Sequence, residues 1–445
     1  MSLKFYTTPT AGRPWRPPVM EEDCRRYRHR ARRTDKWIPP QLALEEIVRN
    51  NTASPCSLND FMDFLVYVEQ DAEPLQFFLW YCGYIHSWTT ELTPEQRAVA
   101  PRWDPDRGRT LAPGERRANN SSKVGSILEM LDEESDRGVS KAGSSRHKRN
   151  ASVVTKLPHP TMAVIKEEKD EEGREAADFQ AAPESQPFRA DIDAITKHYI
   201  HLDGPRRLNL TKDDRNAVLA ATATTTHPSA LLLAFEKSEA VLRGKLHPDF
   251  IRYSMANANR ATTRLLRLVG CLLLFLGLAL DAVLVLSPFS RYYRLTSTPL
   301  IFAGLAILVA AIDGVSLSLY LASRRQIRPW EVPEDLEAGT GGGGGGEKHH
   351  RRKATPESVA GAVDPLRKQS LQTLGPANVF SGEEWVAAYQ RRRLWRLLFE
   401  RKSGSRNQDL RLLQHGVVAG AVLWATLTTV GLGAGSVFIP SHDMF

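Results

Sequence analysis

The sequence predicts an all-α fold, in which a helical bundle split by a long disordered insertion is followed by three transmembrane helices. Two segments, 41–91 and 190–256, carry apolar residues at helical spacing. The segment between them, 92–188, is too rich in Pro, Ser, Arg and Glu to bury a core. Three later stretches are apolar over about 18 or more residues, the length that crosses a bilayer as a helix.

The composition favours a membrane protein. The 445 residues include 59 Lys and Arg against 51 Asp and Glu, a net charge of +8, and the basic residues gather beside the apolar stretches. The four cysteines lie far apart without a CxxC pair, which predicts neither a zinc site nor a disulfide scaffold. We find no nucleophile and base pair, no metal cluster and no nucleotide loop, so we expect no enzyme activity, metal or cofactor.

Residues 1–40 form a basic N-terminal arm. Within it, "CRRYRHRARRTDKW" (24–37) combines seven Arg or Lys with two aromatic residues. Such a segment either lies on the anionic inner leaflet of a membrane, where each basic residue contributes about 1 kcal/mol, or remains a solvated arm. Because the chain contains no recognition motif for nucleic acid, we do not expect nucleic-acid binding.

The first half of the helical domain is predicted at 41–91. Ser57 and Asp60 have the spacing of a capping box, which predicts a helix beginning there. Pro74 fits the first position of the next helix, where its missing N–H costs nothing. Both helices carry apolar stripes, so they are expected to share a core. The same spacing resumes at 190–256, which predicts the second half of one domain.

The membrane part is predicted as a hairpin of two spans (264–323) and a third span (416–439). Between them, residues 324–380 contain a run of glycines and read as a flexible linker. Residues 381–411 predict an amphipathic basic helix that lies in the membrane interface. The alternative is a soluble helix docked on the helical domain.

The basic residues that flank the spans predict the orientation. They precede the first span, follow the second and precede the third, whereas the tail after the third has no Lys or Arg. By the positive-inside rule, the N-terminal domain is expected in the cytosol and the C-terminal tail outside the cell or in a lumen. We expect the membrane to be the plasma membrane.

Two features of the spans suggest partners within the bilayer. Asp281 and Asp313 fall inside the first two spans, and we expect Asp281 toward the outer side and Asp313 nearer the middle. Intramembrane carboxylates are usually functional, which favours a role in binding a partner. The third span has glycines four residues apart, a spacing that allows close approach to another membrane protein or a second copy. These are Gly416, Gly420, Gly431 and Gly435.

The segment "SLNDFMDFLVYVEQDAEPLQFFLWYCGY" (57–84) resembles the first half of an RGS domain, the helical module that binds Gα subunits. "AFEKSEAVLRGKLHPDFIRYS" (234–254) resembles its last helices. An RGS-like module with three spans is similar to the fungal membrane RGS proteins of bud-site selection and cell polarity. The resemblance implies a Gα partner that is contacted near Glu73, Pro74, Phe77 and Phe235, and acceleration of GTP hydrolysis without covalent chemistry.

The chain departs from the family pattern at two positions. RGS domains carry Asn directly after the residue that corresponds to Glu73, where this chain has Pro74, and the turn before the helix of Phe235 lacks a second Asn. Losing two polar contacts of roughly 1–3 kcal/mol each predicts weak or absent acceleration. The expected function is therefore a membrane-anchored RGS-like regulator or scaffold of G-protein signalling. The alternative is a polarity landmark that recruits partners without contacting Gα.

Overall fold

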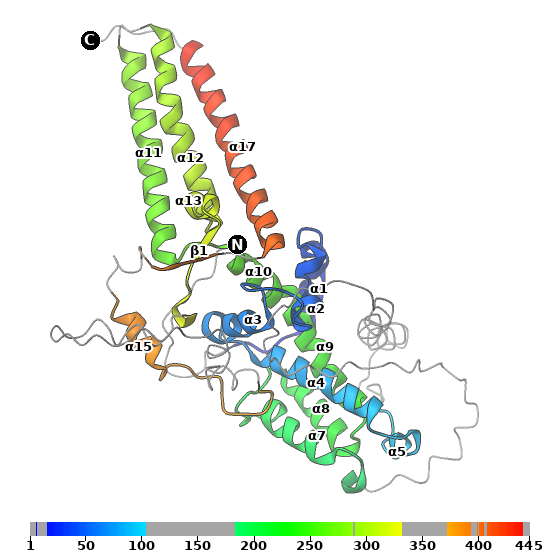
Figure 1. Cartoon of the computed structure of the whole chain (residues 1–445). Coiled ribbons are helices and arrows are strands. Elements are labelled where there is room, and N and C mark those ends of the chain that lie inside the picture. Colours follow the sequence, from blue (N-terminus) through cyan, green and yellow to red (C-terminus); the bar gives the residue numbers. More distant parts are fainter. Residues whose placement is uncertain are drawn as a thin grey trace, which may run out of the picture.

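The computed structural model describes residues 6, 16–103, 183–287, 290–331, 372–392, 398, 400–404 and 407–438. These residues are mostly helical, with one antiparallel pair of short strands, which confirms the predicted all-α class. Figure 1 shows a helical domain from which three long helices extend side by side. Most of the predicted insertion, 104–182, lies outside the described residues.

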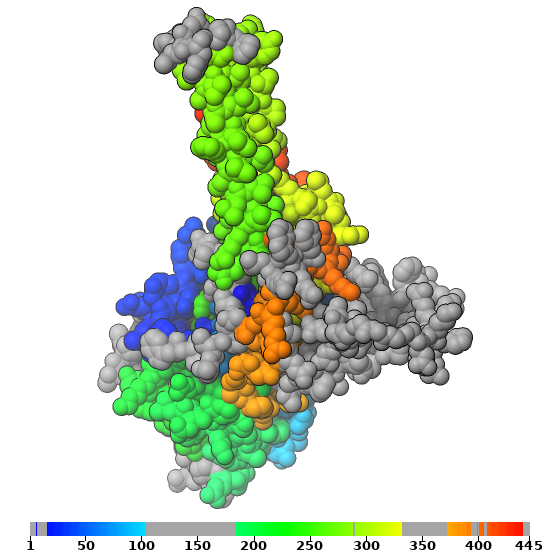
Figure 2. Space-filling model, turned by 90° about the vertical axis from the view of Figure 1, so that its left-hand side faces the viewer, coloured from blue at the N-terminus to red at the C-terminus, as the bar shows by residue number. Residues whose placement is uncertain are grey.

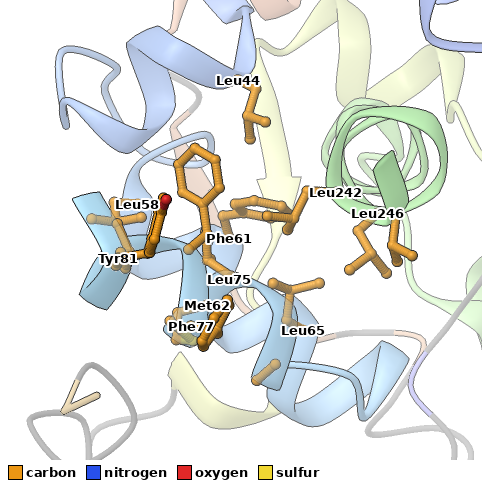
Figure 3. Close-up of a cluster of buried hydrophobic side chains, with 14 of the residues drawn as sticks. Leu44, Leu58, Phe61, Met62, Leu65, Leu75, Phe77, Tyr81, Leu242 and Leu246 are labelled. Atoms are coloured by element: carbon orange, nitrogen blue, oxygen red, sulfur yellow. The ribbon is translucent and has the colours of Figure 1, made fainter. Parts of the chain in front are cut away.

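The two halves of the helical domain close on one core. The first half contributes α3 (Leu58–Phe64), the π-helical turn η2 (Leu65–Glu69) and α4 (Glu73–Thr90). The second contributes α7 (Arg189–Ile195), η6 (Thr196–Ile200), α8 (Lys212–Thr224), η7 (Pro228–Leu231), α9 (Leu232–Val241), η8 (Leu242–Leu246) and α10 (His247–Met255). Side chains of both halves meet in Figure 3.

Aromatic pairs join these halves across the insertion. The ring centroids of Phe61 and Phe250 are 4.7 Å apart, and those of Phe78 and Phe235 are 5.2 Å apart in a stacked arrangement. Such pairs contribute about 0.5–1.5 kcal/mol beyond the burial of their area. The edges of the predicted disordered insertion are ordered instead, with α5 (Pro94–Ala98) at one end and η5 (Pro183–Ser185) at the other. They belong to this domain, because the Trp103 N–H donates to the Ser229 hydroxyl at 2.8 Å and the Gln186 side chain donates to the Thr224 carbonyl at 3.1 Å.

Local sequence explains where the first helices begin and end. The Ser57 side chain accepts a hydrogen bond from the backbone of Asp60, and the Asp60 carboxylate accepts one from the Ser57 backbone at 3.1 Å, as predicted. Gln70 then adopts a left-handed conformation that ends η2. Pro74 stands in the first turn of α4, where it has no N–H to leave unpaired.

The basic N-terminal segment is a helix packed on the domain rather than a solvated arm, and its contact with the inner leaflet remains a prediction. Helix α1 (Glu21–Thr34) buries Cys24, Ala31 and Thr34 and lies against η8 and α9. Its Arg30 makes an ion pair of 2.8 Å with Asp249. The acidic residues of α1 are confined to its first turn and the arginines follow, while the buried side chains face the domain and fix the position of the helix. The short η1 (Pro40–Leu42) and α2 (Leu44–Val48) follow.

The close approach of α1 to η8 yields a prediction for Gly244. A Cβ atom at this position would lie 2.5 Å from the Tyr27 Cα, which is backbone and cannot move aside alone. We expect Gly244→Ala to destabilise the domain by about 1–3 kcal/mol through overpacking. Trypsin should then cleave within the arginine-rich α1 faster than in the wild type.

The matched control is Gly83→Ala on α4. A Cβ at Gly83 meets nothing within 4 Å, and alanine is the better helix former by up to about 1 kcal/mol. This variant should melt at or above the wild-type temperature. If Gly244→Ala and Gly83→Ala destabilised the domain equally, close packing of α1 on Gly244 would not be the cause.

Three helices are long and apolar enough to cross a membrane: α11 (Arg260–Leu286), the run of η9 and α12 (Arg291–Ile312), and α17 (Gln408–Phe438). The predicted hairpin therefore exists, but α12 proper (Thr298–Ile312) ends eleven residues before 323, and the short α13 (Leu317–Leu321) follows a break at Gly314. Most of the apolar surface of these helices is left uncovered by protein.

The helical domain and the spans are joined by polar contacts. The Asn257 side chain donates to the Ser316 carbonyl at 3.1 Å and accepts from the Ser316 N–H at 2.7 Å. The Gln414 side chain donates to the Met255 carbonyl at 2.9 Å, which attaches the start of α17 to α10. Strands β1 (Arg324–Gln326) and β2 (Lys402–Gly404) pair beside this junction, and η10 (Pro329–Glu331) follows β1.

These contacts correct the predicted linker and interfacial helix. The described ends of the linker, 324–331 and 372–380, pack on the protein rather than forming free tethers. Among the described residues of 381–411, the structure has the short α15 (Glu384–Gln390), strand β2 and the first residues of α17 rather than one long helix. Val386 of α15 is buried in the domain core, so the docked alternative is the one observed.

A covered candidate surface on the helical domain

The four residues that the resemblance assigned to a Gα contact are buried. Glu73 is 2% exposed, Phe77 0% and Phe235 1%, and Pro74 is also buried. Phe77 faces Tyr199 at a centroid distance of 5.7 Å, and Phe235 stacks on Phe78 in the core. In this arrangement none of these four side chains is presented to a partner.

Residues 372–390, here called the cover segment, lie over the start of α4. The Asn378 side chain donates to the Glu73 carboxylate at 3.2 Å and to the Gln76 side-chain oxygen at 3.0 Å. Gln76 donates back to Asn378 at 3.0 Å. Figure 2 shows the cover segment, in orange, against the domain beneath the long helices. The polar beginning of α4 is therefore closed off by a segment about 300 residues later in the chain.

Arg206 holds the other end of the cover segment. Its Nε donates to the Pro376 carbonyl at 2.8 Å, and its Nη1 donates to the carbonyls of Thr373, at 3.3 Å, and Gln372. The Arg206 side chain is only 2% exposed. Tyr199, on the neighbouring turn, donates its hydroxyl to the Thr373 carbonyl. Burial raises the pKa of Tyr199 to about 12, so the hydroxyl stays protonated and keeps donating.

An aromatic cluster secures the second half of the cover segment. Phe380 and Trp385 each contact Tyr67 of η2, with ring centroids 5.2 Å apart in both pairs. Trp330 of η10 lies 5.0 Å from Tyr67 and 6.0 Å from Trp385. This cluster combines residues from three distant parts of the chain. The sequence signal for it was the density of Trp and Tyr in 381–402, which was interpreted as membrane-facing.

The turn before α9 does not adjoin Glu73. The Tyr84 hydroxyl donates to the Thr226 carbonyl, and Tyr81 donates to the Pro228 carbonyl at 3.0 Å, so this turn contacts the later part of α4. Tyr84 is about 16 Å along the helix from Glu73 at 1.5 Å per residue. The first turns of α4 are instead contacted by Tyr199 of η6, whose ring centroid lies 5.7 Å from that of Phe77.

The two aspartates of the spans lie at opposite ends of the hairpin. Asp281 accepts a hydrogen bond from the Ser297 hydroxyl at 3.1 Å, beside the fully buried Arg294. Asp313 is exposed directly after α12 ends, and the neighbouring Ile312 carbonyl accepts from Arg267 at 3.0 Å. The expectation that Asp313 lies near the middle of the bilayer is therefore wrong, because α12 ends before it.

The glycines of the third span do not pack within this chain. A Cβ at any of them meets nothing within 4 Å among the described residues; they are Gly416, Gly420, Gly431 and Gly435. Close packing occurs instead between α11 and α12, where Gly270 and Gly277 approach Gly304 and Ile301. The available signal was the seven-residue spacing of Gly270 and Gly277, which places both on one helix face. Association of the third span with a partner remains a prediction.

Comparisons with models of protein families, with curated proteins and with solved structures each returned no match for this chain. Among the described residues, no group of three or more His, Cys, Asp or Glu side chains is placed to hold a metal ion.

Proposed function

We propose that this chain is a membrane-anchored RGS-like regulator or scaffold of heterotrimeric G-protein signalling, whose Gα-facing surface is restricted by the cover segment. The observation that supports it is the joining of the two RGS-like motifs in one core, through Phe61 with Phe250 and Phe78 with Phe235. A second support is that three span-length helices emerge from this same domain.

Two features favour weak acceleration of GTP hydrolysis. Pro74 occupies the place of an interface Asn and has no polar side chain to offer a switch loop. The carboxylate of Glu73 accepts from Asn378 of the cover segment, so a partner would have to displace this hydrogen bond. Hydrogen bonds to charged groups contribute about 1.5–3 kcal/mol each, which lowers the affinity of any competitor by the same free energy.

The proposal places the helical domain in the cytosol and the residues after α17 outside the cell or in a lumen. Arg260, Arg264 and Arg267 at the domain end of α11, with Arg324 and Arg325 after α13, support this by the positive-inside rule. We further propose the plasma membrane as the site of action and cell polarity, as in fungal bud-site selection, as the process.

A second candidate function is a polarity landmark that recruits other proteins without contacting Gα. The burial of Glu73, Pro74, Phe77 and Phe235 favours it, because an RGS-type contact needs an accessible surface at the start of α4.

Single-turnover hydrolysis of GTP on purified Gα subunits separates the two functions. Full-length protein in lipid nanodiscs should accelerate hydrolysis less than about threefold, and Arg206→Ala, which loosens the cover segment, should accelerate it further. If neither the wild type nor Arg206→Ala changed the rate of GTP hydrolysis at saturating concentration, across a panel of Gα subunits, the landmark function would be favoured. Strong acceleration by the wild type would show that the cover segment does not restrict access.

A further inference from the structure

A cavity of about 50 Å³ lies where the helical domain meets the spans. Its lining combines the stretch before α11, including Asn257 and Asn259, with β1 and the residues that follow it. Three arginines line it, Arg260, Arg325 and Arg328. A water molecule needs about 10–15 Å³ on this measure, so the cavity has room for a group of several heavy atoms.

Arg328 is a buried cation with unused hydrogen-bonding capacity. It is 8% exposed, and its guanidinium lies over the ring of Tyr253, 4.5 Å from the centroid. Its Nη1 has no hydrogen-bond partner among the described residues. A buried donor without a hydrogen-bond partner costs free energy, and a charged donor costs more than a neutral one. Because Arg328 lines the cavity, an acceptor that is held there and reaches Nη1 would remove this cost.

The acidic residues nearby do not balance the arginines. Glu331 accepts from both Nη atoms of Arg325, at 2.8 and 3.1 Å. Burial raises the pKa of Glu331, but the guanidinium groups of Arg328 and Arg325 outweigh it, so Glu331 carries one negative charge at neutral pH. Glu400 accepts from Arg392 at 3.2 Å and from Asn259 at 3.0 Å. Asp60 is a third carboxylate close enough to act on Arg328. The four arginines Arg260, Arg325, Arg328 and Arg392 still exceed the three carboxylates, so a positive excess remains around the cavity.

The cavity stands at the level of lipid headgroups. The uninterrupted α11 from Leu265 to Leu286 is about 33 Å long at 1.5 Å per residue, close to the hydrocarbon thickness of roughly 30 Å. Arg260 then lies about 7 Å beyond the hydrocarbon edge, within the headgroup layer of roughly 5–8 Å. As the first residue of α11 it also stands at the positive end of the helix dipole.

We propose that this cavity binds the phosphate of an anionic phospholipid headgroup from the leaflet on the side of the helical domain. Arg260, which is exposed, reaches the phosphate from the membrane side, and Arg328 offers its unused donor from the protein side. Because the cavity joins α11 to β1 and to the residues after it, a bound headgroup stabilises the junction between domain and spans. The cavity shares one lining residue, Tyr389, with the end of the cover segment, but the proposed headgroup binding does not depend on Gα binding.

The test uses the full chain in nanodiscs made of phosphatidylcholine, a zwitterionic lipid, without detergent. Dioctanoyl phosphatidic acid is then added to these nanodiscs. We expect phosphatidic acid to raise the melting temperature in a saturable manner, whereas added dioctanoyl phosphatidylcholine should not. Arg260→Gln should weaken the apparent affinity at least fivefold. Arg264→Gln, an equally exposed arginine one turn later that does not line the cavity, should change it less than twofold.

Two results would overturn the proposal. Equal weakening by Arg260→Gln and Arg264→Gln would show attraction to a general basic belt rather than to a site. Saturation by inorganic phosphate at the same concentration as by phosphatidic acid would assign the cavity to free phosphate instead of a lipid. Circular dichroism of each variant checks that the helices are intact, and Arg260→Glu, which reverses the charge at an exposed position, should abolish the response.

Discussion

Gly304→Leu is expected to separate the first two membrane helices and to lower the melting temperature of the full chain by roughly 5–10 °C. A Cβ at Gly304 would lie 2.6 Å from the backbone nitrogen of Leu274 and 2.9 Å from the Gly270 carbonyl oxygen. Both are backbone atoms of α11, so the helices must move apart as whole elements. Overpacking costs about 1–3 kcal/mol, and each kcal/mol shifts the melting temperature by about 2–4 °C in a cooperative unit of roughly 150–250 residues.

Gly431→Leu on α17 is the matched control for this substitution. It adds the same side chain to a membrane helix, but a Cβ there meets nothing within 4 Å. The melting temperature of this variant should stay within about 2 °C of the wild type, measured by thermal aggregation in the same nanodiscs. If Gly431→Leu destabilised the protein as much as Gly304→Leu, the packing of α12 on α11 would not explain the loss.

Arg206→Ala is expected to open the cover segment. The substitution removes the donor to three carbonyls of residues 372–376, and the cation was almost fully buried. Losing these charge-assisted hydrogen bonds should cost about 2–4 kcal/mol, which raises the open fraction by roughly 30-fold to 10³-fold. Amide hydrogen exchange across 372–380 should accelerate accordingly, while exchange in α3 and α4 changes little.

Arg207→Ala tests whether this effect belongs to the cover segment. Arg207 is the exposed neighbour and donates within its own loop, to the Leu202 carbonyl at 3.3 Å. Exchange across 372–380 should match the wild type in this variant. If Arg206→Ala and Arg207→Ala accelerated hydrogen exchange across 372–380 equally, the loop as a whole, and not the Arg206 contacts, would hold the cover segment.

The features that could be predicted from the sequence are those decided locally. The capping box of Ser57 and Asp60 fixes a helix start through groups three residues apart, and the structure has it. The three spans follow from the length and apolar composition of each stretch. The sharing of one core by the two halves followed from apolar stripes on both, because each stripe needs another to cover it.

The features that were missed depend on contacts between distant residues. Trp385 and Val386 have a composition suited both to a membrane interface and to a protein surface, and only the tertiary fold decides between them. Glu73 is covered by Asn378, which stands about 300 residues later in the chain. No local sequence pattern predicts this contact. The glycine spacing on α17 defines one face of the helix but does not say which element packs against it. Gly304 of α12 packs closely against α11 although no second glycine stands four residues from it.

Capture of Gα in its GDP and aluminium fluoride state by the full chain in nanodiscs decides whether the cover segment hides a G-protein surface. We expect Arg206→Ala to capture at least tenfold more Gα than the wild type, and Arg207→Ala to capture no more than the wild type. Failure of the opened variant to capture any Gα subunit, with hydrogen exchange confirming that its cover segment is open, would contradict the proposed function.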